Sequence, residues 1–219
     1  MHPANEVARK WSAPSFALEM QNSVPAVSRA AAFAALQSAA RTWNHVGAAT
    51  VIEPVLAGDD LDANPVARDG RNRVGVYPGL WPWPASVGAV TAVWTDSSGS
   101  TIEEADLALN PSFDFAADRD GKTGTYDITD VLTHELGHAL GLPDIQETRE
   151  ATMFYLILPG ETLKRDLSHE DEAMLFKLYQ GIDDPTPGCS AAGQDTPGVV
   201  GACAVTLLAM RRRTQRARR

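Results

Sequence analysis

The stretch from His134 to Asp144 constrains this chain more than any other part of its sequence. It reads His-Glu-Leu-Gly-His-Ala-Leu-Gly-Leu-Pro-Asp, so histidines stand at positions 134 and 138 and Glu135 directly follows the first. Because residues four apart lie on one face of an α-helix, both imidazoles can bind one metal ion, and the glutamate can lie beside a water on that metal. The spacing therefore predicts a helix that carries most of a metal site.

Two further residues complete the predicted site. Gly141 can adopt the positive φ that ends a helix and turns the chain, and this turn can bring Asp144 back as a third ligand. Three protein ligands and one water make a catalytic zinc site with an open position. The alternative is a surface pair of histidines at the end of an ordinary helix, with Asp144 solvated.

Apolar periodicity and turn residues place this helix in an α+β domain. Helices are predicted at residues 27–46, at residues 127–141 and from residue 168 onward. Strands are predicted at residues 16–20, 50–56, 73–77, 88–95 and 101–109. Pro54 places the second strand at an edge or a bulge of the sheet, because proline has no N–H for the ladder.

Serine and aspartate mark where the helices begin. Ser28 is the predicted N-cap of the first helix. Asp127 with Asp130, and Ser168 with Asp171, have the spacing of capping boxes at the second and third helices. Their carboxylates also favour helix N-termini electrostatically.

Length and composition predict one compact domain with tails. A chain of 219 residues with 44% hydrophobic residues can bury a single core. We expect a lead-in at residues 1–13, the folded domain at 14–181, a Pro/Gly-rich linker at 182–197, and an apolar, then polybasic, tail at 198–219. The domain has no disulfide framework, because both cysteines, at positions 189 and 203, follow it.

The net charge of −9 conceals an asymmetry. Residues 211–219 hold six arginines; without them 13 basic residues stand against 28 acidic ones, a net charge of −15. Such an acidic body argues against nucleic-acid binding. Asp118, Asp120 and Gly121 have part of the spacing of a Ca²⁺ loop, and the alternative is a surface turn whose acids are solvated.

The chain resembles the metzincin metallopeptidases, and within that clan the matrixins. Their pattern is His-Glu-x-x-His-x-x-Gly-x-x-His or Asp followed by a methionine turn, and residues 151–155, Ala-Thr-Met-Phe-Tyr, are similar to that turn. Residues 101–107 and 165–179 also resemble matrixin segments. The resemblance implies a zincin-like fold, with a mixed twisted sheet, a backing helix, an active-site helix and a C-terminal helix.

This resemblance also implies an activity, that of a monomeric zinc-dependent endopeptidase acting on proteins or peptides. It implies one catalytic Zn²⁺ held by His134, His138 and Asp144, with Glu135 as the general base. Aspartate as the third ligand is the variant found in the snapalysins. The substrate is expected to lie extended along residues 88–95 as an added strand.

The methionine turn has two residues with expected roles. Met153 resembles the apolar floor that lies beneath the metal in metzincins. Tyr155 stands two residues later, where astacin-like relatives place a tyrosine that stabilises the oxyanion. It either has that role or packs in the wall of the specificity pocket, and both interpretations are open.

Two features of mammalian-type matrixins are expected to be absent. The remaining histidines, His2, His45 and His169, are scattered, so no second, structural zinc is predicted. No cysteine precedes Cys189, so latency through a propeptide cysteine is not expected from this chain.

The C-terminal tail resembles sorting signals of the myxobacterial type. It has a Gly-Cys-Ser motif around Cys189, an apolar segment at residues 199–210 and an arginine-rich end. The resemblance implies export to the cell surface or beyond, transient membrane association of the tail, and processing at or near Cys189. It would also imply a signal peptide upstream, which this sequence does not show. The alternative is a disordered basic tail.

Two other functions compete with the peptidase. The first is a surface-anchored binding protein whose zinc only stabilises a metzincin fold. Glu135 speaks against it, because a structural site has no use for a general base. The second is a metal-dependent amidase that acts on cell-wall peptides.

Overall fold

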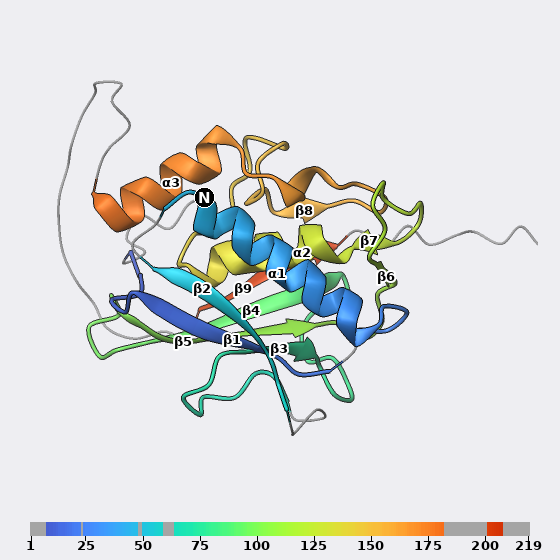
Figure 1. Cartoon of the computed structure of the whole chain (residues 1–219), viewed down its shortest axis with the longest axis horizontal. Coiled ribbons are helices and arrows are strands. Elements are labelled where there is room, and N and C mark those ends of the chain that lie inside the picture. Colours follow the sequence, from blue (N-terminus) through green and yellow to red (C-terminus); the bar gives the residue numbers. More distant parts are fainter. Residues whose placement is uncertain (1–7, 23, 48–49, 59–63, 182–200, 208–219) are drawn as a thin grey trace, which may run out of the picture.

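The computed structural model describes residues 8–22, 24–47, 50–58, 64–181 and 201–207. The elements are β1 Ser15–Met20, α1 Arg29–His45, β2 Val51–Leu56, β3 Arg73–Val76, β4 Val87–Thr95, β5 Ile102–Leu109, β6 Phe115–Ala116, β7 Tyr126–Asp127, α2 Ile128–Ala139, β8 Leu156–Ile157, the 3₁₀ turn η1 Leu163–Arg165, α3 His169–Gln180 and β9 Gly201–Leu207. Figure 1 shows a layer of strands with α1 and α2 on one face and α3 beyond them. The predicted α+β class is confirmed.

Seven strands form one mixed sheet in the order β2-β1-β3-β5-β4-β9-β8. β1 pairs in parallel with β2 and β3, β3 pairs in parallel with β5, and β4 pairs antiparallel with both β5 and β9. The five predicted strands are all present, each within one residue of its expected bounds. Pro54 lies in β2 at the edge of the sheet, as predicted.

Helix α1 covers α2 with small side chains. Ser28 caps α1 as predicted, since its hydroxyl accepts a hydrogen bond from the N–H of Ala31 at 3.2 Å. The buried residues of α1 are Ala32, Ala35, Leu36, Ala39, Ala40 and Trp43. Trp43 Nε1 donates to the carbonyl of Thr133 in α2 at 2.7 Å. The two helices are therefore joined by both close packing and a buried hydrogen bond.

The predicted capping box at the start of α2 is only half formed. Asp127 accepts from the N–H of Asp130 at 2.9 Å, but the Asp130 carboxylate is buried and has no hydrogen-bond partner within the described part of the chain. Arg165 reaches Asp127 instead, at 2.9 and 2.6 Å. Burial, followed by the charge of Asp127, raises the pKa of Asp130 to about 8.

Two boundaries also differ from the sequence prediction. Helix α2 ends at Ala139 rather than near Gly141, because the chain already turns there. The segment 116–126, predicted as loop alone, is bounded by the short parallel pair β6–β7.

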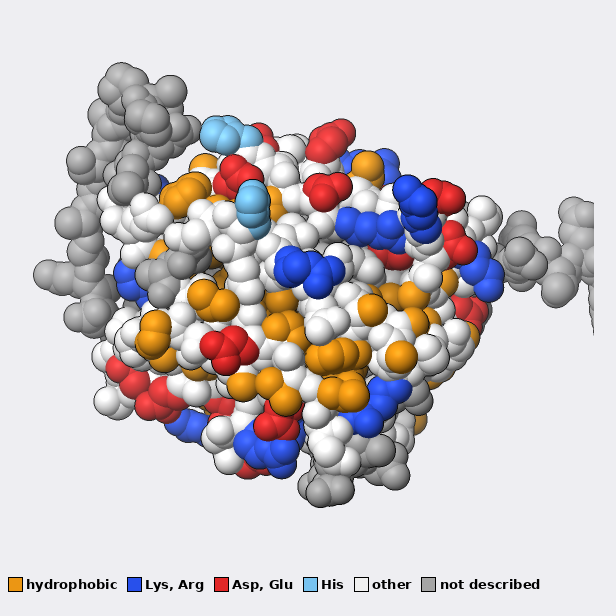
Figure 2. Space-filling view, in the orientation of Figure 1, with side chains coloured by type: hydrophobic (Ala, Val, Ile, Leu, Met, Phe, Trp, Pro, Cys, Tyr) orange, Lys and Arg blue, Asp and Glu red, His pale blue; other side chains and the backbone are white. Residues whose placement is uncertain are grey.

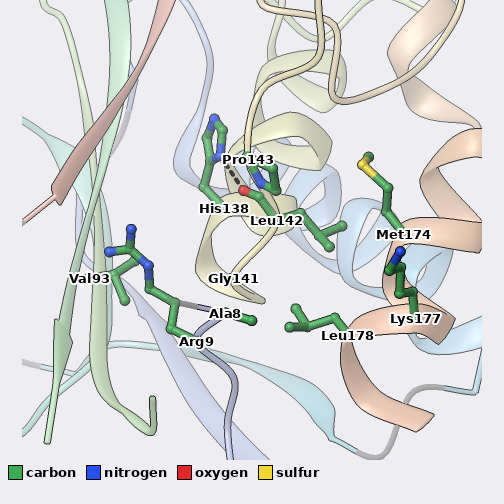
Figure 3. A pocket seen from close by; sticks show the side chains of 10 residues that line it. All are labelled: Ala8, Arg9, Val93, His138, Gly141, Leu142, Pro143, Met174, Lys177 and Leu178. Atoms are coloured by element: carbon green, nitrogen blue, oxygen red, sulfur yellow. Dashed lines mark hydrogen bonds between the residues drawn. The ribbon is translucent and has the colours of Figure 1, made fainter. Parts of the chain in front are cut away.

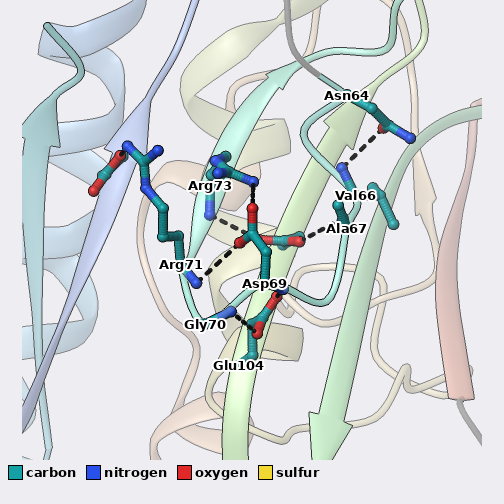
Figure 4. A network of polar contacts seen from close by, with 10 residues as sticks. Asn64, Val66, Ala67, Asp69, Gly70, Arg71, Arg73 and Glu104 are labelled. Atoms are coloured by element: carbon teal, nitrogen blue, oxygen red, sulfur yellow. Dashed lines mark hydrogen bonds and ion pairs between the residues drawn. The ribbon is translucent and has the colours of Figure 1, made fainter. Parts of the chain in front are cut away.

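Carboxylates on β5 hold the loop that precedes β3 (Figure 4). Glu104 accepts from the N–H groups of Asp69 and Gly70 at 2.9 and 2.6 Å. Asp106 accepts from those of Ala67 and Arg73 at 3.0 and 2.8 Å. Asp106 is fully buried, and this burial raises its pKa to about 7. The loop is therefore anchored to the sheet by side chains whose charge is costly to bury.

Residues 201–207, expected as part of the tail, pair with the sheet as β9. Among the described residues, none of the helices has the length and apolar character needed to cross a membrane. Figure 2 shows acidic and basic side chains interspersed over the face seen in Figure 1. The acidic excess of the sequence therefore does not form one continuous patch on that face.

Candidate metal centre

Helix α2 places both predicted histidines in the interior. His134 and His138 are 0% and 1% exposed and lie one turn apart. Each ring is held from behind by a backbone carbonyl: His134 Nδ1 lies 2.7 Å from the oxygen of Thr152, and His138 Nδ1 lies 2.8 Å from that of Leu142. A carbonyl only accepts, so both Nδ1 atoms carry the proton and both Nε2 atoms present a lone pair.

One ring nitrogen of each histidine and one carboxylate oxygen of Asp144 converge on one point. The two Nε2 atoms are 3.0 Å apart, and Asp144 Oδ1 lies 3.2 Å from that of His134 and 3.4 Å from that of His138. Asp144 Oδ1 is buried without a hydrogen-bond partner in the described residues. Lone pairs held this close repel one another unless a cation lies between them.

This arrangement fits zinc. Tetrahedral zinc with bonds of about 2.0–2.1 Å separates its ligand atoms by roughly 3.3 Å, close to the distances here. Two imidazoles and one carboxylate are a donor set that zinc uses in catalytic sites. The structure thus brings together all three predicted ligands, and they are the one group of at least three such side chains found among the described residues.

Gly141 makes the turn that brings Asp144 to the histidines. Its φ is +98°, the positive value that was predicted. The N–H groups of Gly141 and Leu142 donate to the carbonyls of His138 and Gly137, each at 2.9 Å, which closes the helix end. A β-carbon at position 141 would also collide with the carbonyl oxygen of Arg9. Only glycine therefore satisfies both the backbone conformation and the space at this turn.

Glu135 lies beside the histidines and is fully buried. The hydroxyl of Thr91 in β4 donates to Glu135 Oε2, while Oε1 has no partner within the described part of the chain. Burial raises the pKa of Glu135, although the two histidines oppose the shift. The carboxylate therefore has one oriented oxygen and one oxygen available to a substrate or water. Sequence reasoning missed Thr91, because a single threonine in a strand carries no recognisable signal.

Met153 lies beneath α2, as expected for the methionine turn. It is fully buried, and a β-carbon at Gly137 would collide with its sulfur. The turn is held by Asp171, which accepts from the N–H groups of Thr152 and Met153 at 2.7 and 2.9 Å. Asp171 also forms the predicted capping box with Ser168. The sequence indicated that cap but not the second role of the same carboxylate.

Tyr155 remains without an assigned role. Its N–H donates to the carbonyl of Ile145 at 3.1 Å, and its ring packs on Phe154 with 4.7 Å between centroids. The side chain is 38% exposed. These contacts place the backbone of Tyr155 next to the loop that carries Asp144, and its two predicted roles stay predictions.

A pocket of about 400 Å³ opens beside His138 (Figure 3). Its mostly apolar lining comes from the N-terminal segment, β4, the turn after α2 and α3. The lining residues are Ala8, Arg9, Val93, His138, Gly141, Leu142, Pro143, Met174, Lys177 and Leu178. An apolar group of a ligand therefore has space to enter directly beside His138.

The remaining site predictions are not tested by these contacts. Asp118 Oδ1 accepts from the N–H of Asp120 at 3.0 Å, the geometry of a local turn, and Ca²⁺ binding there stays a prediction. The absence of a structural zinc also stays a prediction, since His2 lies outside the described residues. Cys189 also lies outside the described residues, and its processing stays a prediction.

Comparison with known proteins agrees with this geometry. Residues 91–180 match the family model described as Matrixin, a span that runs from Thr91 through the ligands and the methionine turn to α3. No curated protein matches the chain. Matrixins are zinc metallopeptidases, and the matched span holds the cluster of two histidines and one aspartate. Over residues 91–180, which hold the candidate metal centre, the chain is therefore similar to the matrixins.

Proposed function

We propose that this protein is a zinc-dependent endopeptidase that hydrolyses peptide bonds in proteins. The observation that carries the proposal is the convergence of His134, His138 and Asp144 next to the buried carboxylate of Glu135. A purely structural zinc site is closed by four protein ligands. Here three ligands meet and a carboxylate stands beside them, which is the arrangement of a hydrolytic site.

The residues of the chain have separate roles in the proposed reaction. Zinc, when bound, supplies a Lewis acid that makes water more acidic and offsets negative charge on the scissile carbonyl. Glu135 accepts the proton of the attacking water and delivers it to the leaving amine. Thr91 holds one oxygen of Glu135, so the other keeps its direction. The carbonyls of Thr152 and Leu142 keep each Nε2 unprotonated and directed inward.

The test is cleavage of fluorescein-labelled casein by the zinc-loaded full chain. Cleavage is expected to stop with a chelator and to return when zinc is added back. Glu135→Gln keeps the size of the side chain but removes the base, so turnover should fall by roughly 10²–10⁴-fold with zinc content unchanged. Undiminished cleavage by Glu135→Gln would exclude this mechanism.

The same assay separates the competing functions. A non-catalytic binding protein would bind zinc and leave casein intact, with or without Glu135. A cell-wall amidase would leave casein intact and release fragments from purified peptidoglycan. The unpartnered oxygen of Glu135 favours a hydrolase over the binding protein.

We also propose that the protein is exported and that its tail is processed at or near Cys189. The support is the order of the Gly-Cys-Ser motif, the apolar segment and the arginines in the sequence. Mass spectrometry of the protein from its native cells would test this. A mature chain that still ends at Arg219 would contradict it.

A further inference from the structure

The edge of β4 next to the metal centre is occupied by another part of the same chain. β9, Gly201–Leu207, pairs antiparallel with β4 on the side away from β5. Its other side pairs in parallel with β8, which directly follows Tyr155. An extended segment thus lies between β4, which contacts α2, and β8, which follows the methionine turn.

The direction of each backbone N–H and C=O group in β4 shows which of these groups pair with β9. The carbonyl of Gly88 accepts from the N–H of Asn110 at 2.8 Å, so the polar groups of Gly88 face β5. Because these directions alternate along a strand, Ala89 and every second residue after it face β9. The residues of β4 that face β9 are Ala89, Thr91 and Val93, which the register places opposite Val205, Cys203 and Gly201.

These β4 residues are the ones that adjoin the candidate centre. The side chain of Thr91 bonds Glu135, and that of Val93 lines the pocket beside His138. A peptide substrate that added a strand at this edge would place its backbone beside the general base. The same N–H and C=O groups cannot pair with two strands at once. Occupation by β9 therefore excludes a substrate that binds in this way.

We propose that Gly201–Leu207 is an inhibitory strand that occupies the peptide-binding edge of β4 in the full chain. The inference rests on the proposed endopeptidase function, because it assigns the regulation of that site. Substrate enters only in molecules whose β9 has left β4, so turnover is proportional to the fraction of such molecules.

Covalent attachment explains why a short strand suffices. Residues 182–200 join α3 to β9 along the chain, and any peptide of that length spans at most roughly 60 Å when fully extended. A segment attached covalently to its binding site has an effective concentration on the order of millimolar. Even weak pairing then keeps the edge occupied against a dilute substrate. Cleavage of the chain between α3 and β9 would remove this advantage and release the strand.

The test uses three variants of the full zinc-loaded chain. Cys203→Pro removes an N–H that faces β4, whereas Ala204→Pro removes one that faces away from β4. The two variants therefore differ in the side of β9 that loses a hydrogen-bond donor. Cys203→Ser keeps the N–H and removes the thiol. The measurements are casein cleavage, hydrogen exchange at the amides of Thr91 and Val93, and the intact mass of each chain.

Cys203→Pro is expected to raise kcat/KM for casein by roughly tenfold and to expose the amides of Thr91 and Val93 to exchange, since the ladder is broken at its centre. Ala204→Pro and Cys203→Ser should both keep the low turnover and the slow exchange. A synthetic peptide with the sequence of residues 201–207 should inhibit the Cys203→Pro variant and restore its protection.

Four results would overturn the proposal. The first is unchanged exchange at the amides of Thr91 and Val93 in Cys203→Pro, and the second is faster exchange there without faster casein cleavage, although the enzyme is active. The third is an equal gain in casein cleavage in Cys203→Ser, and the fourth is cleavage of the chain within residues 201–207. The last would make the strand a substrate rather than an inhibitor. If no variant cleaves casein, the proposed function fails, while the exchange at Thr91 still decides whether β9 occupies the edge.

Discussion

The carboxylate of Asp171 accepts a hydrogen bond from the backbone N–H of Met153 at 2.9 Å. Asp171 is the third residue of α3, and its other oxygen accepts from Thr152 and Ser168 at 2.7 and 2.8 Å. The carbonyl of Thr152 in turn holds the ring of His134. One buried carboxylate thus connects the start of the last helix with the methionine turn and, through that turn, with a candidate metal ligand.

Asp171→Asn should therefore weaken zinc binding from a distance. The amide group of asparagine would point one donor at a backbone N–H, so the turn would lose a hydrogen bond and His134 its fixed direction. Loss of such an outer contact typically lowers metal affinity by about 10–100-fold. Competition with a chromophoric chelator measures it. Glu170→Gln removes the same charge from an exposed position in the same helical turn and should leave the affinity unchanged.

Asp144→Ala tests the third ligand directly. Removing it leaves two histidines, so zinc should bind with at least tenfold lower affinity, a loss of about 1.4 kcal/mol or more. Zinc titration of the full chain measures this, and circular dichroism shows whether the fold is kept. Unchanged zinc affinity would mean that Asp144 is not a ligand.

Gly137→Ala should destabilise the domain although alanine favours helices. Its β-carbon would collide with the sulfur of Met153 and lie 2.9 Å from Cζ2 of Trp43, and both side chains are buried. Overpacking of this kind typically costs about 1–3 kcal/mol of unfolding free energy. Urea unfolding measures it. Gly58→Ala is the control, because nothing lies within 4 Å of the added carbon there.

The stability of the domain should fall as the pH rises toward neutrality. Burial raises the pKa of Asp106 from 3.8 to about 7, so the folded state binds more protons than the unfolded state between these values. The contribution of Asp106 to the unfolding free energy then decreases across this window, by up to about 4 kcal/mol, and is constant above it. Asp130, with a pKa of about 8, adds a slope of the same sign.

Asp106→Asn isolates the contribution of Asp106. Relative to the natural chain, the variant should be more stable at pH 8 than at pH 5, since asparagine carries no charge to bury. Urea unfolding of both proteins at the two pH values gives this difference. Asp114→Asn, at an exposed position, should show no such change. Parallel pH curves for Asp106→Asn would show that Asp106 ionises at its ordinary pKa in the folded protein.

Local pattern was enough to predict most elements and half of the metal centre. The distance of four residues brings His134 and His138 together on any α-helix, whatever surrounds it. Ser28 and Ser168 mark helix starts because their hydroxyls accept from N–H groups within the same turn. The half-formed box at Asp130 shows the limit of such reasoning, because spacing alone does not predict that the Asp130 carboxylate is buried without completing the box.

What the sequence by itself determined is therefore what depends on neighbours within one or two turns: the helix of the candidate metal centre, its glycine turn and the serine caps. The tertiary structure decided which distant groups meet there. Thr91 reaches Glu135, Asp171 holds the methionine turn, and β9 pairs with the edge of β4. These contacts join residues more than fifteen positions apart through backbone groups and single polar side chains. Periodicity and spacing carry no information about such partners, because only the packed sheet and helices bring them within hydrogen-bond distance.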